Sequence, residues 1–186
     1  MTVDELVDDA KTRMDKSVEA MRHELTGVRT GRASAALLDR VQVDYYGTRT
    51  PLNQLAQISV PDARLLTITP YDKSAIKEIE RAVLESDLGL NPANDGKVVR
   101  IPIPSLTEER RKELSRLVHK LAEEGRNSVR TVRRDANERL KKLLKDHKIS
   151  EDDERRGLED VQKITDQHVA MIDDLQKKKD GELLGK

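Results

Sequence analysis

The stretch TEERRKELSRLVHKLAEEGRNSVRTVRRDANERLKKLLK, residues 107–145, predicts one long amphipathic helix. It contains no proline, and its apolar positions recur every three or four residues, the spacing of one helical face: Leu114, Leu117, Leu121, Gly125, Val129, Val132, Ala136, Leu140 and Leu143. We expect Thr107 to cap this helix, with Glu108 and Glu109 facing the positive end of its dipole. Gly125 weakens the helix by about 1 kcal/mol relative to alanine, and its small size should let another helix approach closely.

Two further segments have the same periodicity. Residues 3–29 repeat apolar side chains at Val3, Val7, Ala10, Met14, Val18, Met21, Leu25 and Val28. Ser150 and Asp153 form a capping-box pattern that opens a third helix. The apolar face of that helix comprises Leu158, Val161, Ile164, His168, Ile172 and Leu175. We expect its tail, residues 177–181, to fray. Three apolar stripes of similar length can cover one another in an elongated three-helix bundle.

The segment between the first two helices changes character. Residues 41–45 alternate apolar and polar side chains as a strand does, and Gly47 marks a turn. Short strands are also expected near residues 57–60, 65–69 and 98–101. Asp72 should cap a helix that runs to about Asp87 and carries Ile76, Ile79, Val83 and Leu84. The expected fold class is therefore α+β, a three-helix bundle with an inserted small β/α/β domain.

The expected domain boundaries follow from this order. Residues 1–30 and 106–186 form the bundle, an RNA-binding rod, and residues 31–105 form the insert. The chain crosses between the two domains twice, so we expect a two-strand hinge. Its residues are Thr30, Gly31, Arg32, Pro102, Pro104 and Ser105.

Composition excludes several classes of protein. Of 186 residues 38% are charged, and the only aromatic residues are Tyr45, Tyr46 and Tyr71, so any core is aliphatic. The absence of cysteine excludes disulfides, thiol catalysis and zinc sites with cysteine ligands. The N-terminus lacks the pattern of a signal peptide, and no apolar run approaches the roughly 20 residues that span a bilayer. We therefore expect a cytoplasmic protein with no membrane partner.

Known catalytic and metal-binding patterns do not fit this chain. The histidines, His23, His119, His147 and His168, lack the i, i+4 spacing of a helical metal site, and we expect each on the surface or at a bundle edge. Residues 91–96 fail as a calcium loop, and Val98 replaces the Ser or Thr that a phosphate-binding loop needs. We expect no catalytic residues, no metal, no cofactor, no small-molecule substrate and no enzymatic activity.

Arginines provide the strongest candidate site. The net charge is zero, but residues 108–148 hold 14 Lys or Arg against 8 Asp or Glu. Arg126, Arg130 and Arg133 share one helical face, which should lie well away from the apolar stripe, and Arg134 flanks them. The planar guanidinium suits phosphate, although a plain solvated face is the alternative. Because aromatic residues are scarce, recognition of the backbone of structured RNA is favoured over base stacking.

A second basic cluster, Arg29 and Arg32, surrounds Gly31 at the expected hinge. These residues could bind RNA or could be linkers that the fold requires.

Several strings of the sequence resemble bacterial ribosome recycling factor. They are VRTGRAS at 28–34, DYYG at 44–47, SDLGLNP at 86–92, LTEERR at 106–111 and VRRDAN at 132–137. The resemblance covers essentially the whole chain and includes the order of helix, α/β insert and two helices.

The resemblance implies an L-shaped, monomeric protein with a transfer-RNA-like outline and a mobile insert. It implies binding across the A and P sites of the large ribosomal subunit, with the bundle on 23S ribosomal RNA. Subunit splitting would require elongation factor G and GTP. Arg130 and Arg133 would be the principal RNA contacts, with Arg29 and Arg32 as candidates at the elbow.

Two other functions remain open from the residues alone. A coiled-coil adaptor that binds protein helices would expose an apolar stripe and self-associate. An enzyme that uses the α/β insert would have a deep polar pocket with convergent carboxylates.

Overall fold

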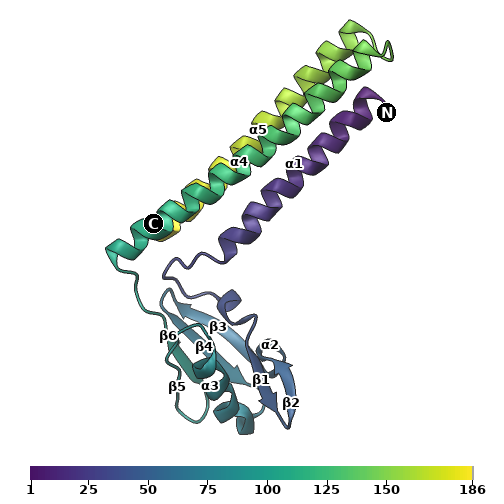
Figure 1. Cartoon of the computed structure of the whole chain (residues 1–186). Coiled ribbons are helices and arrows are strands. Elements are labelled where there is room, and N and C mark those ends of the chain that lie inside the picture. The colour runs from purple at the N-terminus through teal and green to yellow at the C-terminus, as the bar shows by residue number, and fades with distance from the viewer. Residues whose placement is uncertain (186) are drawn as a thin grey trace. The chain divides into compact units, whose positions relative to one another are not determined.

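The computed structural model describes residues 1–185 and divides into two compact units. The first comprises Met1–Thr30 and the chain from Glu108 onward, and the second comprises Gly31–Thr107. The first unit consists of three helices that run side by side (Figure 1): α1 (Val3–Thr26), α4 (Glu108–Lys145) and α5 (Glu151–Leu183). The second unit contains the strands, so the predicted α+β class is confirmed.

The helix ends of the bundle follow from local chemistry. Ser150 and Asp153 form the predicted capping box of α5, and Thr2 and Glu5 form an equivalent box at α1 that the sequence analysis missed. Helix α1 ends at Thr26, three residues before the predicted end, and Gly27 caps it. Fraying of the C-terminal tail was a wrong prediction, because α5 continues to Leu183, whose side chain is 2% exposed.

The buried stripe of the bundle differs from the predicted one at six positions, of which Leu143, Leu158 and Leu175 are only partly buried. Leu6 is buried in place of Val7 on α1. On α4 the first turns bury Val118 and Ala122, whereas Leu117 is 41% exposed and Leu121 is partly buried. The predicted and the observed buried positions both have helical spacing, so periodicity alone could not distinguish between them.

Gly125 lies where α1 and α5 both pack closely against α4. A Cβ atom built on it would lie 3.3 Å from Ile172 Cδ1 of α5 and 3.4 Å from Met21 Sδ of α1. The prediction that this glycine permits a close approach is confirmed.

His168 is buried in the bundle, contrary to the surface or bundle-edge position predicted for it. Its side chain is 1% exposed, its Nδ1 lies 2.6 Å from the Ile164 carbonyl oxygen, and its Nε2 lies 2.6 Å from Asp15 Oδ1 of α1. These contacts satisfy the buried ring and join α5 to α1.

We expect the Asp15–His168 contact to make bundle stability depend on pH. The hydrogen bond from His168 holds the pKa of Asp15 below its usual value. A carboxyl group with a depressed pKa stabilises the fold above its unfolded pKa, and this contribution is lost as the pH falls through the folded value. Asp15→Asn should therefore lower the free energy of unfolding by about 1 kcal/mol at pH 7, because Asp15 is half exposed.

Urea titrations from pH 7 to pH 3 measure this effect. The difference between wild type and Asp15→Asn should shrink below about pH 4, where the wild-type carboxyl becomes protonated. Asp8→Asn is the matched control, because Asp8 is an exposed carboxylate on the same helix. A difference that stays constant down to pH 3 would show that the charge of Asp15 does not act through this contact.

The second unit has more strands than the predicted β/α/β pattern. Strands β3 (Ala56–Asp62), β4 (Leu65–Pro70), β6 (Val99–Pro102) and β5 (Ala93–Asn94) form an antiparallel sheet in that order. Strands β1 (Gln42–Tyr45) and β2 (Thr48–Pro51) form a hairpin. Strands β2 and β5 were not predicted, because β2 has no apolar alternation and β5 has only two residues.

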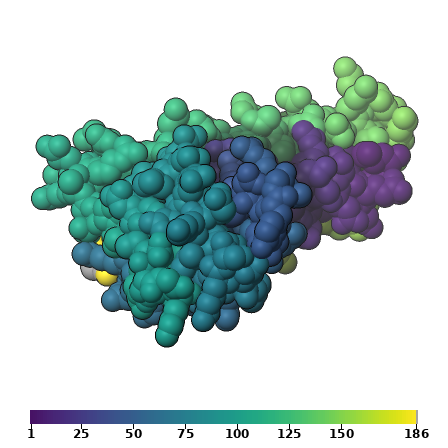
Figure 2. Space-filling view, turned by 90° about the horizontal axis from the view of Figure 1, so that it is seen from below, coloured from purple at the N-terminus to yellow at the C-terminus, as the bar shows by residue number. Residues whose placement is uncertain are grey.

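Four helical segments complete the second unit: η1 (Ala35–Leu38), α2 (Leu52–Leu55), η2 (Lys73–Ala75) and α3 (Ile76–Glu85). Asp72 caps η2, which leads into α3, and α3 buries Ile76, Ile79 and Val83 while Leu84 is 59% exposed. Segments near residues 40 and 100, far apart in the sequence, contribute side chains to one core. The second unit is coloured blue to teal in Figure 2. The core of this unit consists of aliphatic side chains.

Among residues 1–185, no helix is long and apolar enough to cross a membrane.

Candidate nucleic-acid interface

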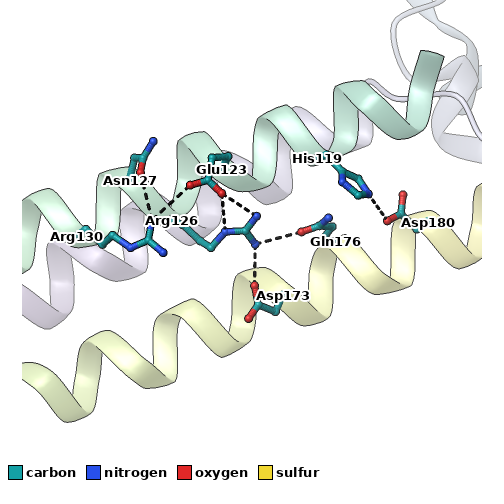
Figure 3. A network of polar contacts seen from close by, with 8 residues as sticks. All are labelled: His119, Glu123, Arg126, Asn127, Arg130, Asp173, Gln176 and Asp180. Carbon is teal, nitrogen blue, oxygen red and sulfur yellow. Dashed lines mark hydrogen bonds and ion pairs between the residues drawn. The ribbon is translucent and has the colours of Figure 1, made fainter. Parts of the chain in front are cut away.

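The arginine row, Arg126, Arg130 and Arg133, lies on one side of α4, but its three members differ in their surroundings. The side chain of Arg126 is only 16% exposed and lies at the seam between α4 and α5. Its guanidinium donates to Asp173 Oδ1 at 2.7 Å and to Gln176 Oε1 at 3.1 Å (Figure 3). It also donates through Nε to Glu123 Oε2 at 3.1 Å. The prediction that the row lies well away from the apolar stripe is therefore wrong for Arg126.

Arg130 and Arg133 are less constrained. Arg130 is 43% exposed, and its Nη1 lies 3.4 Å from Glu123 Oε1 and 3.3 Å from Asn127 Oδ1, both long for a hydrogen bond. Arg133 is partly exposed, and within residues 1–185 its side chain forms no hydrogen bond or ion pair. Arg134 is exposed, and its one side-chain hydrogen bond within the described part of the chain is a long one to Thr131 Oγ1, at 3.5 Å. Arg133 and Arg134 therefore keep their hydrogen-bonding capacity for a ligand.

Asp135 follows the row but does not neutralise it. Its carboxylate is turned toward α1, where it pairs with Arg13, and it also pairs with Arg139 at 3.4 Å. The hydrogen bond from Arg13 holds the pKa of Asp135 below its usual value. Asp135 therefore joins α4 to α1, and its carboxylate does not neutralise the positive charge of Arg133 and Arg134.

The carboxylates that do compensate the row were missed in the sequence analysis. Glu123 precedes the row on α4, and Asp173 comes from α5. Farther along the same seam, Asp180 Oδ2 lies 3.1 Å from His119 Nε2 (Figure 3). Asp180 Oδ1 also accepts a hydrogen bond from Ser115 Oγ at 3.3 Å. Contacts between α4 and α5 depend on how the two helices are aligned, and the spacing of residues within α4 alone cannot predict that alignment.

The two segments of the predicted hinge come together within the second unit. Gly31 has φ +75°, and a Cβ atom there would lie 3.0 Å from Leu106 Cγ, so both conformation and space favour glycine. Pro102 ends β6 opposite Leu65. Of the two flanking arginines, Arg29 follows α1 in the first unit and Arg32 belongs to the second, and both are exposed.

The structure also bears on the two other functions. The apolar stripes of α1, α4 and α5 are buried against one another, which leaves isolated exposed residues such as Leu117 and Met171 where an adaptor needs a stripe. The hollow beside the β1–β2 hairpin is lined by Asp44, Glu78 and Arg81, among others, and is open to solvent. Enzyme sites generally bury most of their ligand, so neither feature supports an adaptor or an enzyme.

Comparisons with known proteins agree on one family. Residues 21–184 match the family model described as "Ribosome recycling factor". The chain is 59% identical over 180 residues to the ribosome-recycling factor of Shouchella clausii, covering 97% of each protein. It is 53% identical over 184 residues to that of Nitratidesulfovibrio vulgaris, covering 99% of each.

Solved structures give the same result. The solution structure of a ribosome recycling factor aligns with a TM-score of 0.78 and 42% identity over 99% of this chain and 98% of the other. A second alignment has a TM-score of 0.66 and 49% identity over 99% of this chain and all of the other. That structure is described as models for the T. thermophilus ribosome recycling factor and the E. coli elongation factor G bound to the E. coli post-termination complex.

Proposed function

Because this chain belongs to the ribosome recycling factor family, we propose that it binds the large ribosomal subunit through α4 and promotes dissociation of the post-termination ribosome. Elongation factor G with GTP is the proposed second factor, since a relative has been described with elongation factor G on such a complex. The proposed ligand of α4 is 23S ribosomal RNA. We propose further that the protein acts in the cytoplasm as a monomer, without enzymatic activity.

One observation supports the RNA site above the others. Arg133 and Arg134 are consecutive residues on a rigid helix, and neither has a carboxylate partner within the described residues. Arg130, on the same side of the helix, is paired weakly with Glu123. Arginine side chains fixed on a helix suit the phosphates of a folded RNA. Arg126 was predicted as part of the same site, and its contacts across the seam favour a supporting role.

The proposed mechanism is mechanical. Phosphate contacts along α4 anchor a stiff bundle on the large subunit, and the translocase pushes the protein so that the bundle acts as a lever on contacts between the subunits. The chain makes and breaks no covalent bond in this scheme.

The function can be tested with purified components. Post-termination ribosomes that receive this protein, elongation factor G and GTP together should dissociate, which lowers light scattering. Either protein alone should leave the signal nearly unchanged. Co-sedimentation with each subunit separately should recover the protein with the large subunit. Recovery with the small subunit alone would contradict the proposed target.

We also propose that the two crossings, Thr30–Arg32 and Pro102–Ser105, act as a hinge, with Arg29 and Arg32 as further RNA contacts. Glycine at 31 permits a change of direction, and the two prolines restrict its range. Distances between spin labels on α4 and α3 should therefore form a broad distribution in solution that narrows on the large subunit. A narrow distribution that is identical in both states would show that the junction is rigid.

A further inference from the structure

Glu123 has an unusual position in the arginine row. Its carboxylate lies between two members, with Oε2 accepting from Arg126 Nε at 3.1 Å and Oε1 lying 3.4 Å from Arg130 Nη1 (Figure 3). Its side chain is 55% exposed, so it stands on the same open surface as Arg130. The hydrogen bond from Arg126 holds the pKa of Glu123 below its usual value, and the carboxylate is therefore charged at neutral pH.

The two arginines depend on Glu123 to different degrees. Arg126 keeps Asp173 at 2.7 Å and Gln176 at 3.1 Å from α5 even without it. Among residues 1–185, the only other hydrogen-bond partner of the Arg130 guanidinium is Asn127, a neutral acceptor at 3.3 Å. Removing the charge of Glu123 should therefore leave Arg126 in place and release Arg130.

We propose that Glu123 is an internal competitor for RNA phosphate, which holds Arg130 in the unbound protein and must be displaced when RNA binds. This inference rests on the proposed RNA-binding function of α4. Arg130 must leave the Glu123 carboxylate before its guanidinium can bind a phosphate fully. The free energy lost with that ion pair reduces the net gain from the RNA contact of Arg130. The Glu123–Arg130 pair thus lowers the affinity of the arginine row for RNA and favours release of the protein after each round of ribosome dissociation.

Glu123→Gln tests the proposal, because glutamine keeps the length of the side chain and an oxygen acceptor for Arg126 but removes the charge. Exposed ion pairs contribute little to stability, so the affinity for purified large subunits should rise only about two- to fivefold. The gain should shrink at high salt, where exposed pairs are screened. A purely structural role for Glu123 predicts the opposite sign, because damage to the bundle weakens binding.

Two matched variants make the result specific. Glu124→Gln removes the same charge from the next residue, about 100° around the helix, and should leave the affinity unchanged. In an Arg130→Ala background, Glu123→Gln should give no gain, because the side chain that it releases is absent. Thermal melts of each variant establish that the bundle is intact.

The outcomes separate this inference from the proposed function. If Glu123→Gln binds no more tightly than wild type, or Glu124→Gln gives the same gain, or the gain persists without Arg130, the competitor role is wrong. The RNA site would still stand if Arg133→Ala weakens binding in the same assay. If Arg133→Ala also binds as wild type does, the proposed site on α4 fails and the inference fails with it.

Discussion

Replacing Arg130 and Arg133 together with alanine should weaken binding to the large subunit at least tenfold and leave the stability of the bundle nearly unchanged. Charge-assisted hydrogen bonds contribute roughly 1.5–3 kcal/mol each, so the loss of two phosphate contacts exceeds a factor of ten even if the pair with Glu123 reduces one of them. Neither arginine fastens α4 to another helix through a hydrogen bond or ion pair within the described residues. Alanine is also at least as good a helix former as arginine.

Three measurements check this result. Titration with large subunits gives the affinity, and urea unfolding should show a change of no more than about 0.5 kcal/mol, as for ordinary surface sites. Lys163→Ala on α5 is the control for a lost positive charge, since Lys163 is exposed on a net acidic segment, and it should change the affinity little. Arg126→Ala should show the reverse pattern and destabilise the bundle, because it leaves Asp173 and Gln176 without their donor. A stable double variant that binds as wild type would reduce the row to a solvated helix surface.

Removing the second unit should abolish recycling while leaving a folded, RNA-binding protein. We expect this because α1, α4 and α5 bury their apolar stripes within the first unit, and the second unit has a separate aliphatic core. A chain in which Thr30 is joined to Glu108 by a short Gly/Ser linker should melt cooperatively and bind the large subunit within about threefold of wild type, because each phosphate contact of α4 is retained. With elongation factor G and GTP, this chain should give no ribosome dissociation above background.

The shortened chain tests separately whether the bundle binds the large subunit and whether the second unit transmits force. A matched control keeps the second unit but carries Leu84→Ala, a change at an exposed side chain of α3 that should leave recycling intact. If the shortened chain unfolds without cooperativity, the bundle is not self-sufficient. If it folds and dissociates ribosomes as well as the full chain does, the second unit has no part in transmitting force.

Helix-forming patterns in the sequence predicted the fold well, and their failures have physical causes. The capping box of Ser150 and the glycine at 125 were recognised because each is a local pattern. The choice between Leu117 and Val118 as the core position depends on which face meets α1 and α5, which one helix alone does not determine. The extension of α5 depends likewise on burial of Leu183.

The candidate site was predictable only in part. The spacing of Arg126, Arg130 and Arg133 placed them on one side of α4, but it could not distinguish a bridging arginine from an unpaired one. That distinction depends on Asp173, 47 residues away in the chain. The side-chain contact of His168 shows the same limit, because its partner Asp15 lies 153 residues away. Long-range polar contacts of this kind have no periodic pattern in the sequence.

The salt dependence of large-subunit binding is the most direct test of the central claim that α4 binds RNA phosphates. Each phosphate contact releases about one condensed counterion, so the logarithm of the affinity falls linearly with the logarithm of the salt concentration. For the double variant Arg130→Ala, Arg133→Ala, the slope should be shallower than that of wild type by about two units. Parallel lines for the two proteins, with the variant as tight as wild type at every salt concentration, would contradict an RNA-binding role for this face.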